Sequence, residues 1–119
     1  MEKKKIELDG KQYTVVLNDS ATAKAFAGLS SFEVAVTEYA RCHYWGGIPE
    51  RLPVSETFKT STPQKGGVYY ADHFQSVAVY FDNSPSIKPY EIVRIGDIEE
   101  DLSALSTAGY SIKLKWKKS

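Results

Sequence analysis

Two short aromatic runs carry the side chains best suited to hold a ligand. The run 43–47 reads His-Tyr-Trp-Gly-Gly, and the run 69–74 reads Tyr-Tyr-Ala-Asp-His-Phe. Aromatic rings offer large flat apolar surfaces, and neighbouring glycines let a ligand approach the backbone closely. If both runs lie at the same end of the fold, they form a shared apolar groove with polar groups at its rim. The alternative is that the rings plug a barrel end or pack across strands.

Metal and nucleophile chemistry find less support in the same region. The possible ligands are His43, His73, Asp72, Glu38 and Cys42. No pair among them has the His-x-x-x-His or Cys-x-x-Cys spacing that sets two ligands on one element, so we predict no metal and no cofactor. Cys42 precedes His43 in an expected strand, where successive side chains point to opposite faces. We therefore expect no direct activation of the thiol by the imidazole.

Composition bounds the class of protein and its partners. A chain of 119 residues is predicted to form one domain, 1–119. Its 15 basic and 15 acidic residues balance, so no global field attracts nucleic acid. No apolar run approaches the roughly 20 residues of a membrane helix, and the N-terminus lacks the apolar core of a signal peptide. The single cysteine fits a reducing cytoplasm, and an exported protein without disulfides would look the same.

The elements that must position these side chains are mostly strands. Apolar and polar residues alternate on both sides of Asp9-Gly10, which predicts a hairpin. Ser20 and Gly28 bound an expected helix over 21–27. Further alternating runs begin near 32, 68, 77, 92 and 110, a second short helix is expected between 97 and 106, and 41–67 is expected to be irregular.

About eight short strands and two small helices predict a mainly β protein, a closed or nearly closed antiparallel barrel. Apolar residues at every second position of these runs are expected to face the core. In the final run these are Tyr110, Ile112, Leu114 and Trp116, which are expected to share one face. The expected buried residues are Ile6, Val15, Phe32, Val34, Val79, Phe81, Val93, Ile112 and Leu114.

Over residues 4–117 the chain resembles the small bacterial cyclophilin-like domain family. The resemblance rests on the order of the N-terminal hairpin, Ala25-Phe26, Glu38-Tyr39 and the segments 48–52, 67–70, 77–81 and 92–98. It implies a cyclophilin-like closed antiparallel barrel. A prolyl isomerase of this fold needs an arginine at the X–Pro bond, a pocket for the proline ring and a histidine nearby. The positions similar to those of the pocket and the histidine are Ala78 and Ile92, and Arg41 is the nearest candidate arginine.

We therefore expect a binding module with an aromatic groove for a small molecule or an extended peptide. The alternative function is a weak peptidyl-prolyl cis-trans isomerase that uses Arg41, and a third possibility is docking of a partner on an exposed strand edge. The oligomeric state stays open. The residues expected to bind the ligand are Arg41, His43, Tyr44, Trp45, Tyr69, Tyr70, His73 and Phe74.

Overall fold

Nine strands and one α-helix make up the regular structure in a computed structural model that describes residues 2–118. The strands are β1 (Lys3–Leu8), β2 (Lys11–Leu17), β3 (Phe32–Tyr39), β4 (His43–Gly47), β5 (Lys59–Thr60), β6 (Gly67–Ala71), β7 (Ser76–Tyr80), β8 (Ile92–Ile98) and β9 (Ser111–Trp116). Helix α1 spans Ala21–Ala27. Three 3₁₀ turns complete the fold: η1 (Glu56–Phe58), η2 (Asp72–Phe74) and η3 (Ser103–Thr107).

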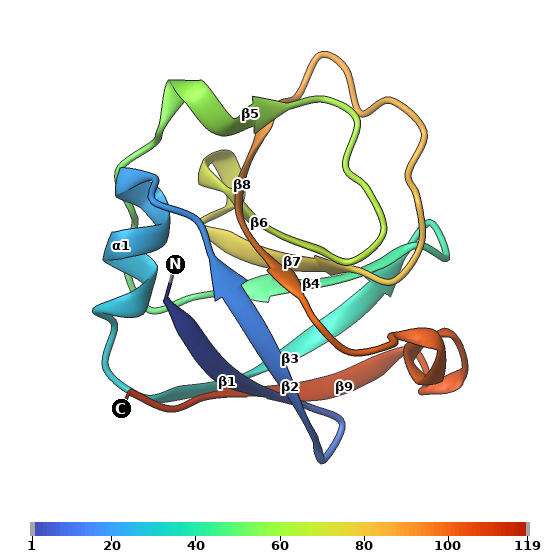
Figure 1. Cartoon of the computed structure of the whole chain (residues 1–119). Coiled ribbons are helices and arrows are strands. Elements are labelled where there is room, and N and C mark those ends of the chain that lie inside the picture. Colours follow the sequence, from blue (N-terminus) through green and yellow to red (C-terminus); the bar gives the residue numbers. More distant parts are fainter. Residues whose placement is uncertain (1, 119) are drawn as a thin grey trace.

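Eight of the strands close into an antiparallel barrel (Figure 1). The order is β2-β1-β9-β3-β4-β7-β6-β8, and β8 returns to β2 by pairing Val15 with Ile98 and Leu17 with Gly96. The two-residue strand β5 adds to β8 beside this closure. The predicted closed barrel is therefore confirmed. Closure leaves no long unpaired edge among the strands of residues 2–118, and partner docking on a strand edge loses its support.

The predicted N-terminal hairpin is confirmed. Asp9 and Gly10 both have positive φ, 53° and 80°, as a two-residue loop requires when it matches the twist of its strands. This turn sets the register of β1 against β2, in which Ile6 pairs with Tyr13. Both side chains are buried, so the turn directs the apolar face of the hairpin into the barrel.

Helix α1 lies on one side of the barrel and η3 on the other (Figure 1). The Ser20 hydroxyl accepts the Ala23 N–H at 3.0 Å, as an N-cap does, and Phe26 packs against Trp116 with ring centroids 4.6 Å apart. On the η3 side the Tyr44 hydroxyl, inside the barrel, donates to the carbonyls of Gly109 and Leu105. The second helix expected between 97 and 106 is wrong in type, because η3 is a single 3₁₀ turn.

The predicted core is confirmed with three exceptions. Phe32 and Val34 on β3 are only partly buried, since they lie toward the outer rim of the core cluster. Tyr110 precedes β9 and is 74% exposed, so it does not continue the inward face of that strand. The segment expected to be irregular also contains β4, which pairs with β3 and β7 in the middle of the sheet.

The outer surface of the barrel differs sharply between its two halves. On β1, β9 and β3 many outward residues are charged, and Lys115 Nζ lies 3.6 Å from a Glu7 carboxylate oxygen and 3.7 Å from one of Glu33. All residues of β6 and β7, by contrast, are buried on both faces. The outward side chains of β6 and β7 form a second apolar cluster with Cys42, Ile92 and Ile87. This second cluster positions the candidate site.

Gly67 is predicted to be required for the second cluster. A Cβ atom there would lie 2.5 Å from Cε1 and 2.7 Å from the hydroxyl oxygen of Tyr69, whose side chain is fully buried. Because the ring has no free space, we expect Gly67→Ala to lower the free energy of unfolding by about 1–3 kcal/mol. Urea unfolding measures this.

Gly47→Ala is the matched control, since its Cβ would meet nothing closer than the Gln75 carbonyl oxygen at 4.0 Å. It is expected to match or slightly exceed the wild type in stability. Equal unfolding midpoints for the two variants would show that the Tyr69 ring is not held in place.

Candidate functional site

A cleft of about 580 Å³ opens on the outer face of the sheet formed by β4, β7, β6 and β8. Its floor is made of small or aliphatic residues, Ala71, Ala78 and Ile92. The alternation of β4 directs His43 and Trp45 outward into this cleft and Tyr44 inward. The site therefore lies on the outside of the barrel wall and not at a barrel end.

One wall of the cleft is the connection between β7 and β8. Its backbone is held to the segment that follows β5, because the Ser84 N–H donates to the Pro63 carbonyl at 3.2 Å and the Ile87 N–H to the Ser61 carbonyl at 2.8 Å. Ile87 also packs on the second apolar cluster. This connection covers only part of the second apolar cluster, and the space that it leaves open is the cleft. Its lining from this wall is Ser84, Pro85, Ser86, Ile87, Lys88 and Tyr90.

Exposed aromatic rings gather at the rim of the cleft. Tyr39 is 65% exposed, Trp45 36%, Phe74 56% and Tyr90 52%. Trp45 and Phe74 lie 5.6 Å apart between ring centroids, in a tilted arrangement. Among the large apolar side chains exposed in residues 2–118, only Tyr110 lies elsewhere. Four of the five large apolar side chains that are exposed in residues 2–118 thus lie around one cleft.

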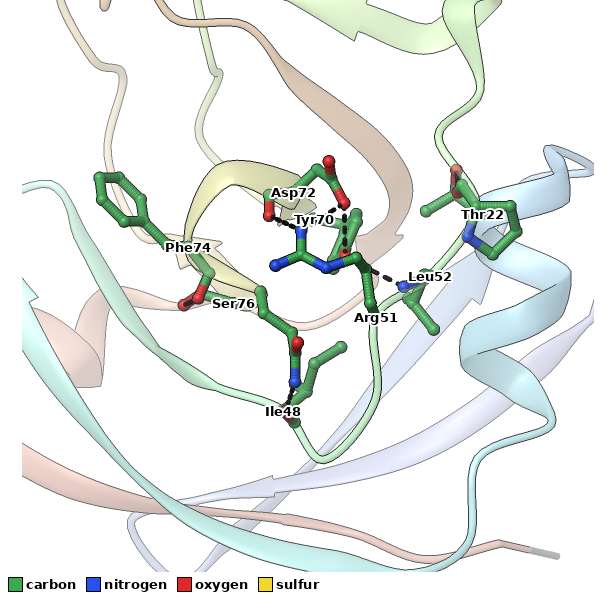
Figure 2. Close-up of polar contacts among 10 residues, drawn as sticks. Thr22, Ile48, Arg51, Leu52, Tyr70, Asp72, Phe74 and Ser76 are labelled. Atoms are coloured by element: carbon green, nitrogen blue, oxygen red, sulfur yellow. Dashed lines mark hydrogen bonds and ion pairs between the residues drawn. The ribbon is translucent and has the colours of Figure 1, made fainter.

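A polar network fixes the turn that carries His73 and Phe74 (Figure 2). The Arg51 guanidinium donates to the Asp72 carbonyl at 2.6 Å and to its Oδ1 at 3.1 Å. The Tyr70 hydroxyl donates to the same Oδ1 at 3.0 Å and accepts the Leu52 N–H at 3.0 Å. Phe74 points away from this network, toward the cleft. The network therefore positions two rim residues without lining the cleft.

His43 and Tyr80 form a stacked pair beside the cleft floor, with ring centroids 4.3 Å apart and an interplanar angle of 20°. Burial lowers the pKa of His43 to about 4, so its imidazole is neutral near pH 7. Burial also raises the pKa of Tyr80, whose side chain is only 3% exposed. Both side chains are therefore uncharged near pH 7.

Cys42 and His43 lie on the same side of the sheet, and the expectation that they point to opposite faces is wrong. Cys42 Sγ is 3.5 Å from His43 Nδ1. The reason is the turn before β4, where Ala40 and Arg41 both have positive φ and leave Cys42 outside the strand. Burial raises the pKa of Cys42, while burial lowers that of His43, so the thiol and the imidazole both stay neutral. The pair has no thiolate nucleophile.

The structure divides the expected site residues among several places. His43, Trp45, His73 and Phe74 line the cleft. Tyr69 lies beneath it, edge-on to Tyr80 at 5.3 Å. The remaining three are elsewhere: Tyr44 and Tyr70 are buried in the barrel core, and Arg41 lines a separate polar depression with Glu38, Lys65 and Asp82. The five aromatic side chains of the expected groove therefore do not all converge.

Sequence reasoning missed three aromatic residues of the cleft, Tyr39, Tyr80 and Tyr90. In the sheet His43 pairs with both Tyr39 and Tyr80, and paired residues point to the same face. Side-chain alternation along these strands could therefore have indicated Tyr39 and Tyr80 once the pairing was known. Tyr90 comes from an irregular connection, and it stacks on His73 at 4.6 Å with an interplanar angle of 8°. No periodic pattern could have found that contact.

Residues 2–118 contain neither a membrane-spanning helix nor a cluster of metal ligands. No helix in this part of the chain is long and apolar enough to cross a membrane. The same residues contain no group of three or more His, Cys, Asp or Glu side chains arranged to hold a metal ion.

A closed eight-stranded antiparallel barrel with a cleft on the outside of its wall defines a class of small β-barrel proteins. Within this class the chain belongs to the Cyclophilin-like family, whose family model matches residues 6–117. The resemblance inferred from the sequence is therefore confirmed.

A solved structure shares the whole fold. It is the solution structure of the hypothetical protein AF2241 from Archaeoglobus fulgidus, with a TM-score of 0.76 over 98% of this chain and 94% of that one. The sequence identity is 13%, so this likeness concerns the fold alone. No curated protein matches the chain.

The partly buried imidazole of His43 predicts a pH-dependent stability. The pKa of His43 is about 4 in the folded state against 6.5 for the ordinary side chain. Between these values the unfolded chain binds more protons, so the free energy of unfolding falls as the pH falls from 6.5 to 4, by up to about 3 kcal/mol from this group. We expect His43→Phe, which can still stack on Tyr80, to lose this part of the dependence. Urea unfolding across this pH range measures it.

His73→Phe provides the control, because His73 is exposed and its replacement is expected to leave the His43 contribution in place. A decline in stability toward pH 4 that is the same in wild type and His43→Phe would show that the imidazole is not held neutral by burial.

Proposed function

We propose that this protein binds a small molecule with a planar ring in the cleft on the outer face of β4, β7, β6 and β8. The observation that carries the proposal is the gathering of Tyr39, Trp45, Phe74 and Tyr90, all exposed, around one cleft. Contiguous exposed apolar surface is uncommon on soluble domains and marks an interaction site. Aromatic rings at such a rim can stack on a flat ligand while the floor buries its edge.

The volume of the cleft favours a small molecule over an extended peptide. Ligand pockets for small molecules typically measure about 300–1,000 Å³, and this cleft has about 580 Å³. Its wall from the β7–β8 connection is tied down by backbone hydrogen bonds to Ser61 and Pro63. A preformed site of this kind loses little conformational entropy when it binds. Peptide binding is the other possible outcome of the test.

The alternative function, a weak prolyl isomerase, has no supporting contact. It requires a guanidinium at the substrate, and the described lining of the cleft includes no arginine. Arg41 lines the separate depression, Arg51 is bound to Asp72 and Arg94 is paired with Asp97. The Cys42–His43 contact likewise provides no activated nucleophile. A binding role therefore fits the side chains better than catalysis.

The proposal predicts that neutral planar-ring compounds bind and that rim rings contribute to their affinity. The probes are benzyl alcohol, indole-3-ethanol and 2-naphthalenemethanol, measured by isothermal titration calorimetry. We expect Trp45→Ala and Phe74→Ala each to weaken binding about 2- to 10-fold, the equivalent of one aromatic contact. Both residues are partly exposed, so the variants should fold.

Tyr110→Ala is the matched control, because Tyr110 is an exposed aromatic residue outside the cleft. It is expected to bind the probes as the wild type does. Affinities that are unchanged in Trp45→Ala and Phe74→Ala would place the site elsewhere. Tighter binding of short X–Pro peptides, with isomerisation well above the uncatalysed rate and lost in Arg41→Ala, would favour the isomerase instead.

A further inference from the structure

We infer that the ligand of this cleft carries a negative charge beside its planar ring, so that the cleft selects ring compounds bearing a carboxylate or a similar anion. This inference rests on the proposed function and adds the charge of the ligand to it. It follows from which polar and charged groups line the cleft and which of them have no partner in the protein.

The lining of the cleft carries positive charge but no negative charge. Lys88 is the only charged side chain among the described residues that line it, and no carboxylate does so. Lys88 is exposed and has no ion-pair partner within residues 2–118. Its ammonium group is therefore available to an anion without first breaking an ion pair.

The acidic side chains around the cleft lie outside its lining. Asp72 is held by the Arg51 guanidinium at 3.1 Å and by the Tyr70 hydroxyl. Glu91 precedes the cleft residue Ile92 in sequence, and Glu38 precedes the cleft residue Tyr39. Asp82 and Glu38 act, after burial, to raise the pKa of Cys42 beside His43. None of these carboxylates lines the cleft. A cationic ligand would therefore find no countercharge within the cleft.

The Tyr80 hydroxyl has no hydrogen-bond partner among residues 2–118. The side chain of Tyr80 as a whole is only 3% exposed. Every fully buried polar side-chain atom in this part of the chain has a hydrogen-bond partner. The Tyr80 hydroxyl has none, so it must be accessible, and Tyr80 lines the cleft. A neutral phenol can donate a hydrogen bond to an anion, and such charge-assisted bonds are the stronger kind.

The neighbouring imidazole completes this arrangement. His43 stacks on Tyr80, and its Nδ1 faces Cys42 Sγ, while its Nε2 has no hydrogen-bond partner in the described chain. The Tyr80 hydroxyl and the His43 Nε2, neither with a hydrogen-bond partner in the described chain, thus belong to two stacked rings of an apolar cleft whose described lining includes one cation, Lys88. This combination suits a single anionic group attached to a flat ring.

Three indoles that share a ring and differ in charge test the inference: indole-3-acetate, indole-3-ethanol and tryptamine. Calorimetry near neutral pH and at low ionic strength is expected to rank the acetate at least about fivefold tighter than tryptamine. Lys88→Met should weaken the acetate about two- to fivefold and leave the ethanol unchanged. Tyr80→Phe should weaken the acetate more than the ethanol, because only the acetate receives a charge-assisted bond.

Lys117→Gln removes the same charge from an exposed site outside the cleft and is expected to change nothing. Aromatic rims also attract cations, so tryptamine is the sharpest competitor. Tryptamine binding as tightly as the acetate, or equal loss of the acetate in Lys117→Gln and Lys88→Met, would overturn the inference and leave the proposed function standing. Absence of binding for all three indoles would count against the proposed function as well.

Discussion

The structure depends on one constraint, that two neighbouring strands of a closed barrel are apolar on both faces. A barrel wall has an inner face filled by the core and an outer face that usually meets water. Strands β6 and β7 break this pattern, because their outward residues Tyr69, Ala71, Ala78 and Tyr80 need cover as much as their inward residues do. The chain supplies this cover with the long connections before β6 and after β7, and the space that they leave open is the cleft.

This origin explains the chemical character of the site. A cleft left between an apolar strand surface and its cover has an apolar floor, and polar groups within it lose their solvation. Hence His43 stays neutral, the pKa of the Tyr80 hydroxyl is raised, and the Cys42 thiol stays protonated. The same burial that makes the cleft apolar thus keeps the Cys42 thiol protonated, and the thiolate is the form in which a cysteine acts as a nucleophile.

The sequence predicted the barrel well because period-two alternation reports inward residues directly, as in β9, and because Asp9-Gly10 sets a local turn. It predicted the site less well for three reasons. The continuous apolar run in β6 gives no sign of which tyrosine points inward, so Tyr69 and Tyr70 were grouped although they lie on opposite faces. The positive φ of Ala40 and Arg41 is unusual for residues other than glycine, and it alone brings Cys42 to His43. The third reason is that contacts from irregular connections, such as Tyr90 on His73, follow no period.

The barrel interior and the cleft are nevertheless not independent. The Tyr70 ring is buried in the main core, but its hydroxyl bonds to Asp72 and Leu52 and so helps to fix the turn that carries Phe74. Fold can persist at 13% identity because interior positions need only apolar residues of suitable volume. A tyrosine at the position of Tyr70 is a stricter requirement, since phenylalanine would fill the same core space but leave the rim turn held by Arg51 alone. Family members that share the barrel can therefore differ in the cleft through single atoms of the core, and the fold alone does not determine what each of them binds.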